Sequence, residues 1–187
     1  MTYAWLAGML TLAWATSASS AAAQIDDVRL GVVAHNFIDR ENKEASADVD
    51  AEFVFKSPEV LEILGCPRPY LMTSVNTAGE TSWAGVGLYW RWEVADGWAV
   101  EPGFGYVIHN GWEDHKFPPG DPRNQERILF GSQDLFRETF AVEREFGPRF
   151  GLQIYFEHLS HGQILGSGRN QGTEELGARA VWRFRDQ

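Results

Sequence analysis

Beyond residue 24, apolar and polar residues alternate along most of the chain with a period of two. Side chains alternate across a strand, so this pattern predicts β-strands that have one apolar face. The clearest run is SWAGVGLYWRWEV at 82–94, which an Ala95-Asp96-Gly97 turn joins to a similar run at 98–109. In the first run one face would carry Ala84, Val86, Leu88, Trp90, Trp92 and Val94, and the other Gly85, Gly87, Tyr89, Arg91 and Glu93.

The same criterion predicts eight strands, the smallest number usual for an outer-membrane barrel. Several are long enough to cross a bilayer at a tilt. The predicted connections are short at one end of the barrel and long at the other, except that 57–68 has room for a helical turn at the short end. The sequence thus predicts an all-β fold, an eight-stranded antiparallel up-and-down transmembrane β-barrel, with strands near 28–37, 48–56, 69–76, 82–94, 98–109, 131–146, 150–160 and 174–184.

Alternation alone does not decide which face of the barrel is inside. A soluble, lipocalin-like barrel would turn its apolar face inward. The bulky aromatic residues are too large for an eight-stranded interior, whereas glycines fit one, so we favour lipid on the outside. The inward glycines would then be Gly85, Gly87, Gly103 and Gly105, and the tryptophans available for interfacial girdles would be Trp83, Trp90, Trp92, Trp98 and Trp182.

Composition narrows the choice of compartment and partner. A formal net charge of -10 argues against nucleic acid as a partner. The single cysteine, Cys66, excludes an intramolecular disulfide and a cysteine metal cluster. Residues 1–23 lack Asp, Glu, Lys and Arg and end in three alanines after an apolar stretch. They predict a secretory signal peptide, with the barrel formed by 24–187.

Three polar residues interrupt the apolar face near the end of the chain. His158 and Ser160 follow Leu152, Ile154 and Phe156 on the same predicted face. The phase of the last strand places Glu174 on that face and turns Glu175 into the barrel. A hydroxyl, an imidazole and a carboxylate are the parts of a nucleophile–base–orienter triad. The alternative is that all three lie in the polar headgroup layer and do no chemistry.

The remaining polar residues have simpler interpretations. Glu157 can form buried ion pairs with Arg179 and Arg183, and His35 and His109 would be hydrogen-bonded inside the barrel. Glu138 interrupts the apolar face of its strand. Glu113, Asp114 and His115 are adjacent, and adjacent residues rarely converge on one ion, so no metal site is predicted. Arg123 and Arg127 lie in a loop where they could meet lipid phosphates.

The runs E-H-L-S-H-G at 157–162 and N-Q-G-T-E at 170–174 resemble the lipid A 3-O-deacylase (PagL) family. The resemblance implies a catalytic histidine, serine and glutamate at His158, Ser160 and Glu174. The family's asparagine after the serine, which helps hold the oxyanion, is His161 here. The His161 side chain, or the backbone N–H groups of His161 and Gly162, could donate instead. Asn170 and Gly172 also match family positions. The resemblance implies that Asn170 belongs with the oxyanion and substrate-binding residues, and the alternative is that Asn170 and Gly172 only shape the turn.

We therefore expect an outer-membrane esterase that removes a (3-hydroxy)acyl chain from lipid A of lipopolysaccharide in the outer leaflet. It would be a multi-pass barrel of the bacterial outer membrane, in contact with its lipids, and would need no metal or other cofactor. The alternatives are a non-catalytic structural or adhesin barrel, a lipocalin-like lipid binder and an acyltransferase. The sequence does not indicate which acyl chain is preferred or whether two barrels form a homodimer.

Overall fold

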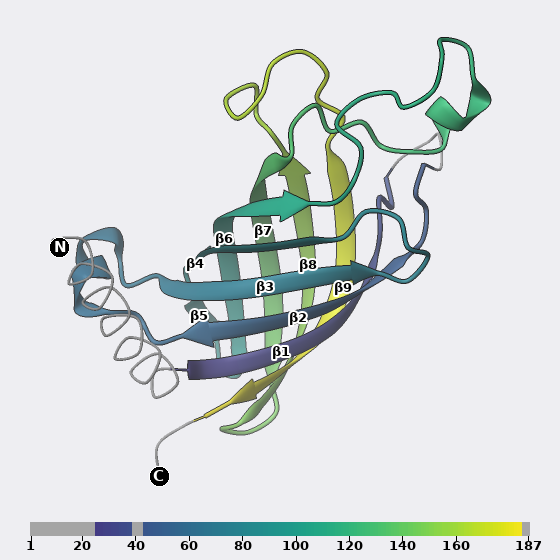
Figure 1. Ribbon diagram of the computed structural model, residues 1–187. Helices are drawn as coiled ribbons and strands as arrows, with labels where there is room; N and C mark the ends of the chain where they lie inside the picture. Colours follow the sequence, from purple (N-terminus) through teal and green to yellow (C-terminus); the bar gives the residue numbers. More distant parts are fainter. Residues whose placement is uncertain (1–24, 39–42, 185–187) are drawn as a thin grey trace, which may run out of the picture.

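The computed structural model describes residues 25–38 and 43–184, so the predicted signal peptide at 1–23 lies outside the described residues. The described chain consists of β-strands and two short 3₁₀ helices, η1 and η2 (Figure 1). Neither helix is long and apolar enough to span a bilayer. The elements are β1 Ile25–Ala34, β2 Ala47–Phe55, η1 Glu59–Leu64, β3 Arg68–Asn76, β4 Trp83–Tyr89, β5 Trp92–Ala95, β6 Trp98–His109, η2 Pro122–Gln125, β7 Asp134–Glu145, β8 Phe150–Ser160 and β9 Thr173–Arg183.

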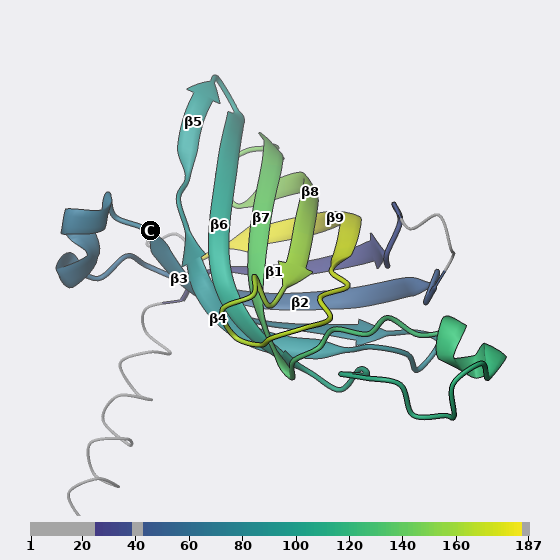
Figure 2. The same cartoon turned by 90° about the horizontal axis from the view of Figure 1, so that it is seen from above.

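The strands close into a barrel in which every neighbouring pair is antiparallel. β1 pairs with both β2 and β9, so the first and last strands lie side by side. On the other side β4 pairs with β6, which closes the sheet (Figure 2). β4 and β5 pair with successive parts of β6 and are two halves of one interrupted strand. The predicted eight-stranded antiparallel barrel is confirmed, with small shifts at the strand ends.

The interruption at Trp90 and Arg91 is a difference from the predicted strand at 82–94. Trp90 N–H donates a 2.9 Å hydrogen bond to the carbonyl oxygen of Pro102 in β6. Proline has no N–H to return the second bond of this pair. The backbone hydrogen bonds between this strand and β6 are therefore interrupted opposite Pro102, and they begin again at β5.

The distribution of apolar side chains is that of a membrane barrel and not of a lipocalin. Large apolar side chains are exposed along the outer face of the strands, among them Leu30, Val32, Val49, Phe53, Leu71, Val86, Phe104, Ile108, Phe140, Ile154 and Leu176. Trp92, Trp98 and Trp182 are also exposed, as expected for a girdle. The assignment of Trp83 to a girdle is wrong, because this side chain is 3% exposed and packs inside against His35 with ring centroids 5.4 Å apart.

The predicted inward glycines are confirmed beside Tyr70, but the expectation that aromatic residues are too large for the interior is wrong. A Cβ at Gly87 would lie 2.4 Å from the Tyr70 hydroxyl oxygen, and one at Gly105 would lie 2.1 Å from it. Tyr70 in turn stacks on Tyr89 with ring centroids 4.2 Å apart. Glycine at these positions therefore makes room for two aromatic rings inside the barrel.

Buried ion pairs fill the rest of the interior, but not between the predicted partners. Glu157 pairs with Arg137. Arg179 pairs with Glu52 at 2.7 Å, and Arg183 pairs with Glu143. The interior location of these residues was predicted correctly and the pairing was wrong, because strand phase shows which side chains point inward but not which of them meet. Arg137 lies on β7 beside Glu157, whereas Arg179 and Arg183 reach past an intervening strand to Glu52 and Glu143.

The two ends of the barrel differ. The connecting segments 35–38, 43–46, 77–82, 110–133 and 161–172 lie at one end, which we call the loop end. The opposite end carries 56–67, 96–97 and 146–149 (Figure 1). The connection 56–67 includes η1, the helical turn expected at the otherwise short end. At the loop end Ile128, Leu129 and Phe130 are buried, and Ile128 and Phe130 join the apolar core. Loop 110–133 therefore packs into the barrel interior.

Candidate active site on the outer face

A histidine and a carboxylate meet on the outer face at the loop end of the barrel. His158 lies near the end of β8, and its cross-strand neighbour at the start of β9 is Glu174. His158 Nδ1 lies 3.1 Å from Glu174 Oε1, and both side chains are about one-third exposed, at 32% and 31%. Glu175 is fully buried on the inner face. The prediction that Glu174 points outward and Glu175 points into the barrel is therefore confirmed.

The hydrogen bond to Glu174 sets the tautomer of His158. A carboxylate only accepts, so Nδ1 carries a proton, and in the neutral form of the ring Nε2 has a free lone pair. Gly172 lies against the Cε1–Nε2 edge of this ring: a Cβ there would lie 2.8 Å from His158 Cε1 and 2.9 Å from the Leu159 carbonyl oxygen. Glycine at 172 thus leaves the space that the imidazole occupies.

Ser160 projects from the same face of β8, two residues beyond His158, and is half-buried. Within the described chain its hydroxyl makes no hydrogen bond to His158. The structure therefore brings two of the three predicted triad residues into contact and places the third beside them on the same face.

His161 is buried, and its polar groups hold loop 161–172 together. Its Nε2–H donates to the Arg169 carbonyl oxygen at 2.8 Å, and its Nδ1 accepts from Gln163 N–H at 3.1 Å. Its backbone N–H donates to Asn170 Oδ1 at 3.2 Å, so Asn170 helps to shape this loop. The remaining predicted oxyanion donor is the backbone N–H of Gly162, which takes no part in these bonds.

A second glutamate flanks the imidazole. Glu138 on β7 is the cross-strand neighbour of His158 on the side opposite Glu174, and it is exposed on the outer face. No hydrogen bond joins it to His158 among the described residues. In the sequence Glu138 was noted only as an interruption of the apolar face. Its position in the alternation predicts an outward side chain, and the pairing of its strand with the next one could have placed it beside His158.

An apolar groove lies on the outer face, along the same two strands. Its volume is about 500 Å³, and β1, β2, β8 and β9 all contribute to it. Leu176 is two residues beyond Glu174 on the same face of β9, and its cross-strand neighbour Phe156 is two residues before His158. The groove walls include Val32, Ala34, Ala47, Ile154, Leu176 and Ala178.

The other predicted polar residues lie away from this site. His109 is hydrogen-bonded to the Ser132 carbonyl oxygen at 2.7 Å and accepts from Gly111 N–H at 3.0 Å, which confirms its interior role. Arg123 is bonded to Asp121 at 2.6 Å, and this pairing lowers the pKa of the Asp121 carboxyl. Arg127 is bonded to Glu44 at 2.5 Å. Glu113, Asp114 and His115 are exposed.

The barrel and its polar pair define a class, that of eight-stranded membrane barrels with a histidine–carboxylate pair on the lipid-facing surface. A family model for the lipid A 3-O-deacylase (PagL) matches residues 68–183. The chain belongs to this family. The match spans β3 to β9 and includes His158, Ser160 and Glu174.

Solved structures agree on the fold. A crystal structure of the outer membrane enzyme PagL superposes with a TM-score of 0.59 at 12% identity, covering 84% of this chain and 99% of that one. A structure from the de novo design of transmembrane beta-barrels gives a TM-score of 0.54 at 8% identity, covering 86% and 96%. No curated protein sequence matches the chain.

Proposed function

We propose that this protein is a lipid A 3-O-deacylase that works as a serine esterase, with Ser160, His158 and Glu174 as its triad. The observation that carries the proposal is the His158–Glu174 hydrogen bond on the outer face, within the segment that matches the family. An ester that never leaves the membrane requires catalytic groups on a lipid-facing surface. Polar groups are costly on such a surface, which favours a functional role for them.

The proposed reaction begins with attack of Ser160 Oγ on the ester carbonyl carbon. His158 Nε2 accepts the hydroxyl proton, and Glu174 stabilises the imidazolium that forms. Alternate residues of a strand lie about 6.6 Å apart, a span that side-chain rotation can close. The proton then passes to the sugar oxygen as the ester bond breaks, leaving an acyl group on Ser160.

Water completes the cycle. His158 takes a proton from a water molecule that attacks the acyl carbon, and the Ser160 oxygen leaves and recovers its proton. The products are a free 3-hydroxy fatty acid and a lipid A with one hydroxyl uncovered. The Gly162 N–H is the proposed donor to the oxyanion in both steps. The mechanism uses no metal or other cofactor.

The site fits a substrate that arrives by lateral diffusion. We place the barrel in the bacterial outer membrane as a multi-pass protein with its loop end outward, so that the site meets the outer leaflet and its lipopolysaccharide. Large apolar side chains around the barrel would contact the membrane lipids. The family match does not extend to oligomeric state, and pairing of barrels is not part of the proposal.

We propose that the apolar groove holds the acyl chain being removed. Leu176 begins the groove two residues from Glu174, and small residues at Ala34, Ala47 and Ala178 create its depth. A flexible hydrocarbon chain gains free energy as its CH₂ groups are buried, by about 0.8 kcal/mol each.

Phenylalanine at position 178 should fill this groove. We expect Ala178→Phe to lower kcat/KM for a 14-carbon hydroxyacyl chain by about 10- to 200-fold, the range for mismatched methylenes in an apolar pocket, and to spare a 10-carbon chain. The measurement is kcat/KM on synthetic lipid A analogues of the two lengths. Ala180→Phe is the matched control, because Ala180 is on the same face of β9 beyond the groove. Equal losses in both variants would contradict the assignment of the groove.

The function itself is tested by mass spectrometry of lipid A from cells that produce the full chain, beside cells with an empty vector. Loss of one ester-linked hydroxyacyl mass from the 3-position, with release of the matching free acid, is the expected result. In H₂¹⁸O the released acid should gain one ¹⁸O, whereas an acyltransferase would put the chain on an acceptor. Unchanged lipid A with a folded protein in the outer membrane would refute the proposal and favour a non-catalytic barrel.

A further inference from the structure

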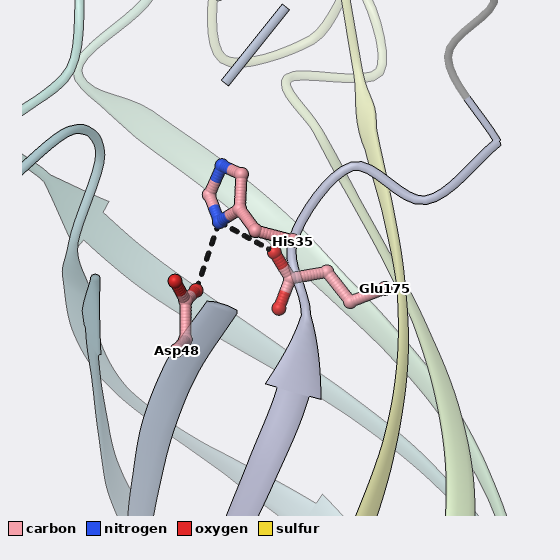
Figure 3. A group of neighbouring side chains, drawn as sticks. All are labelled: His35, Asp48 and Glu175. Carbon is pink, nitrogen blue, oxygen red and sulfur yellow. Dashed lines mark hydrogen bonds and ion pairs between the residues drawn. The ribbon is translucent and has the colours of Figure 1, made fainter. Parts of the chain in front are cut away.

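Four ionisable side chains gather inside the barrel at the loop end, behind the outer-face site. His35 directly follows β1, Asp48 lies in β2 and Glu175 lies in β9, and all three are buried (Figure 3). His35 Nδ1 is 2.8 Å from Asp48 Oδ2 and 3.0 Å from Glu175 Oε1. One donor atom from each of the three lies within 4.8 Å of the others. A single imidazole nitrogen therefore faces two carboxylates.

A third carboxylate lies on the far side of the ring. His35 Nε2 is 3.4 Å from Glu44 Oε2, and Glu44 is held in place by Arg127 and by the Ile128 N–H at 3.1 Å. A carboxylate beside the outer nitrogen of a histidine is the usual way in which proteins orient a metal-binding imidazole. In the metal-free cluster Nδ1 carries a proton, because the carboxylates of Asp48 and Glu175 can only accept it. A metal ion would displace this proton, and Nε2 would then keep the hydrogen that lies toward Glu44.

Glu175 is the side chain that this cluster leaves unsatisfied. It is fully buried, its Oε2 has no hydrogen-bond partner among the described residues, and its Oε1 faces the His35 ring. Asp48, by contrast, accepts bonds from Asn76 at 2.7 Å and Ser74 at 3.1 Å. Glu175 and Asp48 therefore share one imidazole nitrogen as a neighbour, and the second oxygen of Glu175 has none among the described residues. Buried carboxylates that are only partly compensated are costly, so the cluster favours a cation between these oxygens.

We propose that His35 Nδ1, Asp48 and Glu175 bind one divalent transition-metal ion, of the Zn²⁺ class. Imidazole with carboxylates suits Zn²⁺, whereas Mg²⁺ and Ca²⁺ prefer oxygen ligands alone. Ligands about 2.0–2.1 Å from a tetrahedral zinc lie about 3.4 Å from one another. The donor atoms at 2.8 and 3.0 Å would have to move apart by only a few tenths of an ångström to admit the ion.

The ion would tie the end of β1 and the start of β2 to β9, at the residue next to Glu174. Its role is structural, because the donors face the barrel interior while the proposed triad faces outward. The proposal stands on this geometry and is independent of the deacylase activity.

The test is a calorimetric titration of the untagged, folded full chain with Zn²⁺ after treatment with a chelator. We expect one Zn²⁺ per chain, about 100-fold weaker binding in His35→Ala and in Glu175→Gln, and no saturable binding of Mg²⁺. His115→Ala is the matched control, because His115 is exposed beside Glu113 and Asp114 and would report adventitious surface binding. Folding of each variant is checked by its heat-dependent mobility on electrophoresis.

Two results would overturn the proposal. Zn²⁺ affinity that falls in His115→Ala but not in His35→Ala would assign the ion to the surface, and absence of Zn²⁺ binding at millimolar concentration would leave the cluster with a proton alone. X-ray absorption spectroscopy of the Zn²⁺-loaded wild-type chain tests the proposal even if both interior variants fail to fold, because it reports the ligands of the bound zinc. One imidazole together with oxygen ligands would support the site, and a zinc coordination shell without imidazole would contradict it.

Discussion

Replacing Ser160 by alanine is expected to reduce kcat for deacylation by about 10⁶-fold, the loss seen when a serine hydrolase loses its nucleophile. The change removes one oxygen atom from a half-buried position on the outer face, so the barrel should fold as before. The measurement is the rate of hydroxy-acid release from detergent-dispersed lipid A by the purified variant and wild type, with equal amounts of folded protein.

The glutamates on either side of His158 provide the matched comparison. Glu174→Gln should lower kcat by about 10⁴-fold, because an amide stabilises the wrong tautomer and no longer supports the imidazolium. Glu138→Gln makes the same chemical change at the other cross-strand neighbour, which does not bond the ring, and should lower kcat by less than about 10-fold. Equal losses in the two variants, or full activity in Ser160→Ala, would contradict the proposed triad.

Replacing Arg137 by methionine is expected to destabilise the barrel by about 3–5 kcal/mol, the usual result of removing one member of a buried ion pair. Its guanidinium is fully buried and bonds Glu157 at 2.9 Å, Glu52 at 3.0 Å and the Tyr89 hydroxyl at 2.8 Å. Methionine fills similar volume but leaves Glu157 without its cation. The measurement is the free energy of unfolding in urea, followed by tryptophan fluorescence in lipid vesicles.

Arg149→Met is the control for this prediction. Arg149 is exposed in the connection between β7 and β8, and within residues 25–38 and 43–184 only its backbone oxygen is engaged, by Arg183 N–H. We expect a change within about 0.5 kcal/mol there. A similar stability of the two variants would mean that the interior ion pairs add little to the fold.

The alternation of the sequence was sufficient to predict which side chains of each strand point inward and which point outward. A period of two predicted eight strands, their inner and outer faces, and the separation of Glu174 from Glu175. The break in the fourth strand was missed because it depends on Pro102, which is distant in sequence and becomes a neighbour only through register. Trp83 was assigned to a girdle because tryptophan is common there. The alternation of its own strand, which places residue 83 on the same face as Gly85 and Gly87, predicts an inward side chain and should have been preferred.

Contacts among the interior side chains could not be predicted in the same way. Glu157 has an arginine on each adjacent strand and pairs with Arg137 of β7, while Arg179 of β9 pairs with Glu52. The His35 cluster was missed for the same reason, since phase gives the inward direction of its members but not the distances between them. His161 was assigned a role at the oxyanion by position alone, whereas its burial directs both ring nitrogens to its own loop.

The filled interior has a consequence for the membrane that would surround the protein. Salt-bridged arginines, stacked tyrosines and the buried side chains of Ile128, Leu129 and Phe130 fill the interior of the described part of the barrel. We therefore expect the barrel to be a poor conductor of ions in planar bilayers. The proposed reaction on the outer face would then need no opening of the barrel and would leave the permeability of the membrane unchanged.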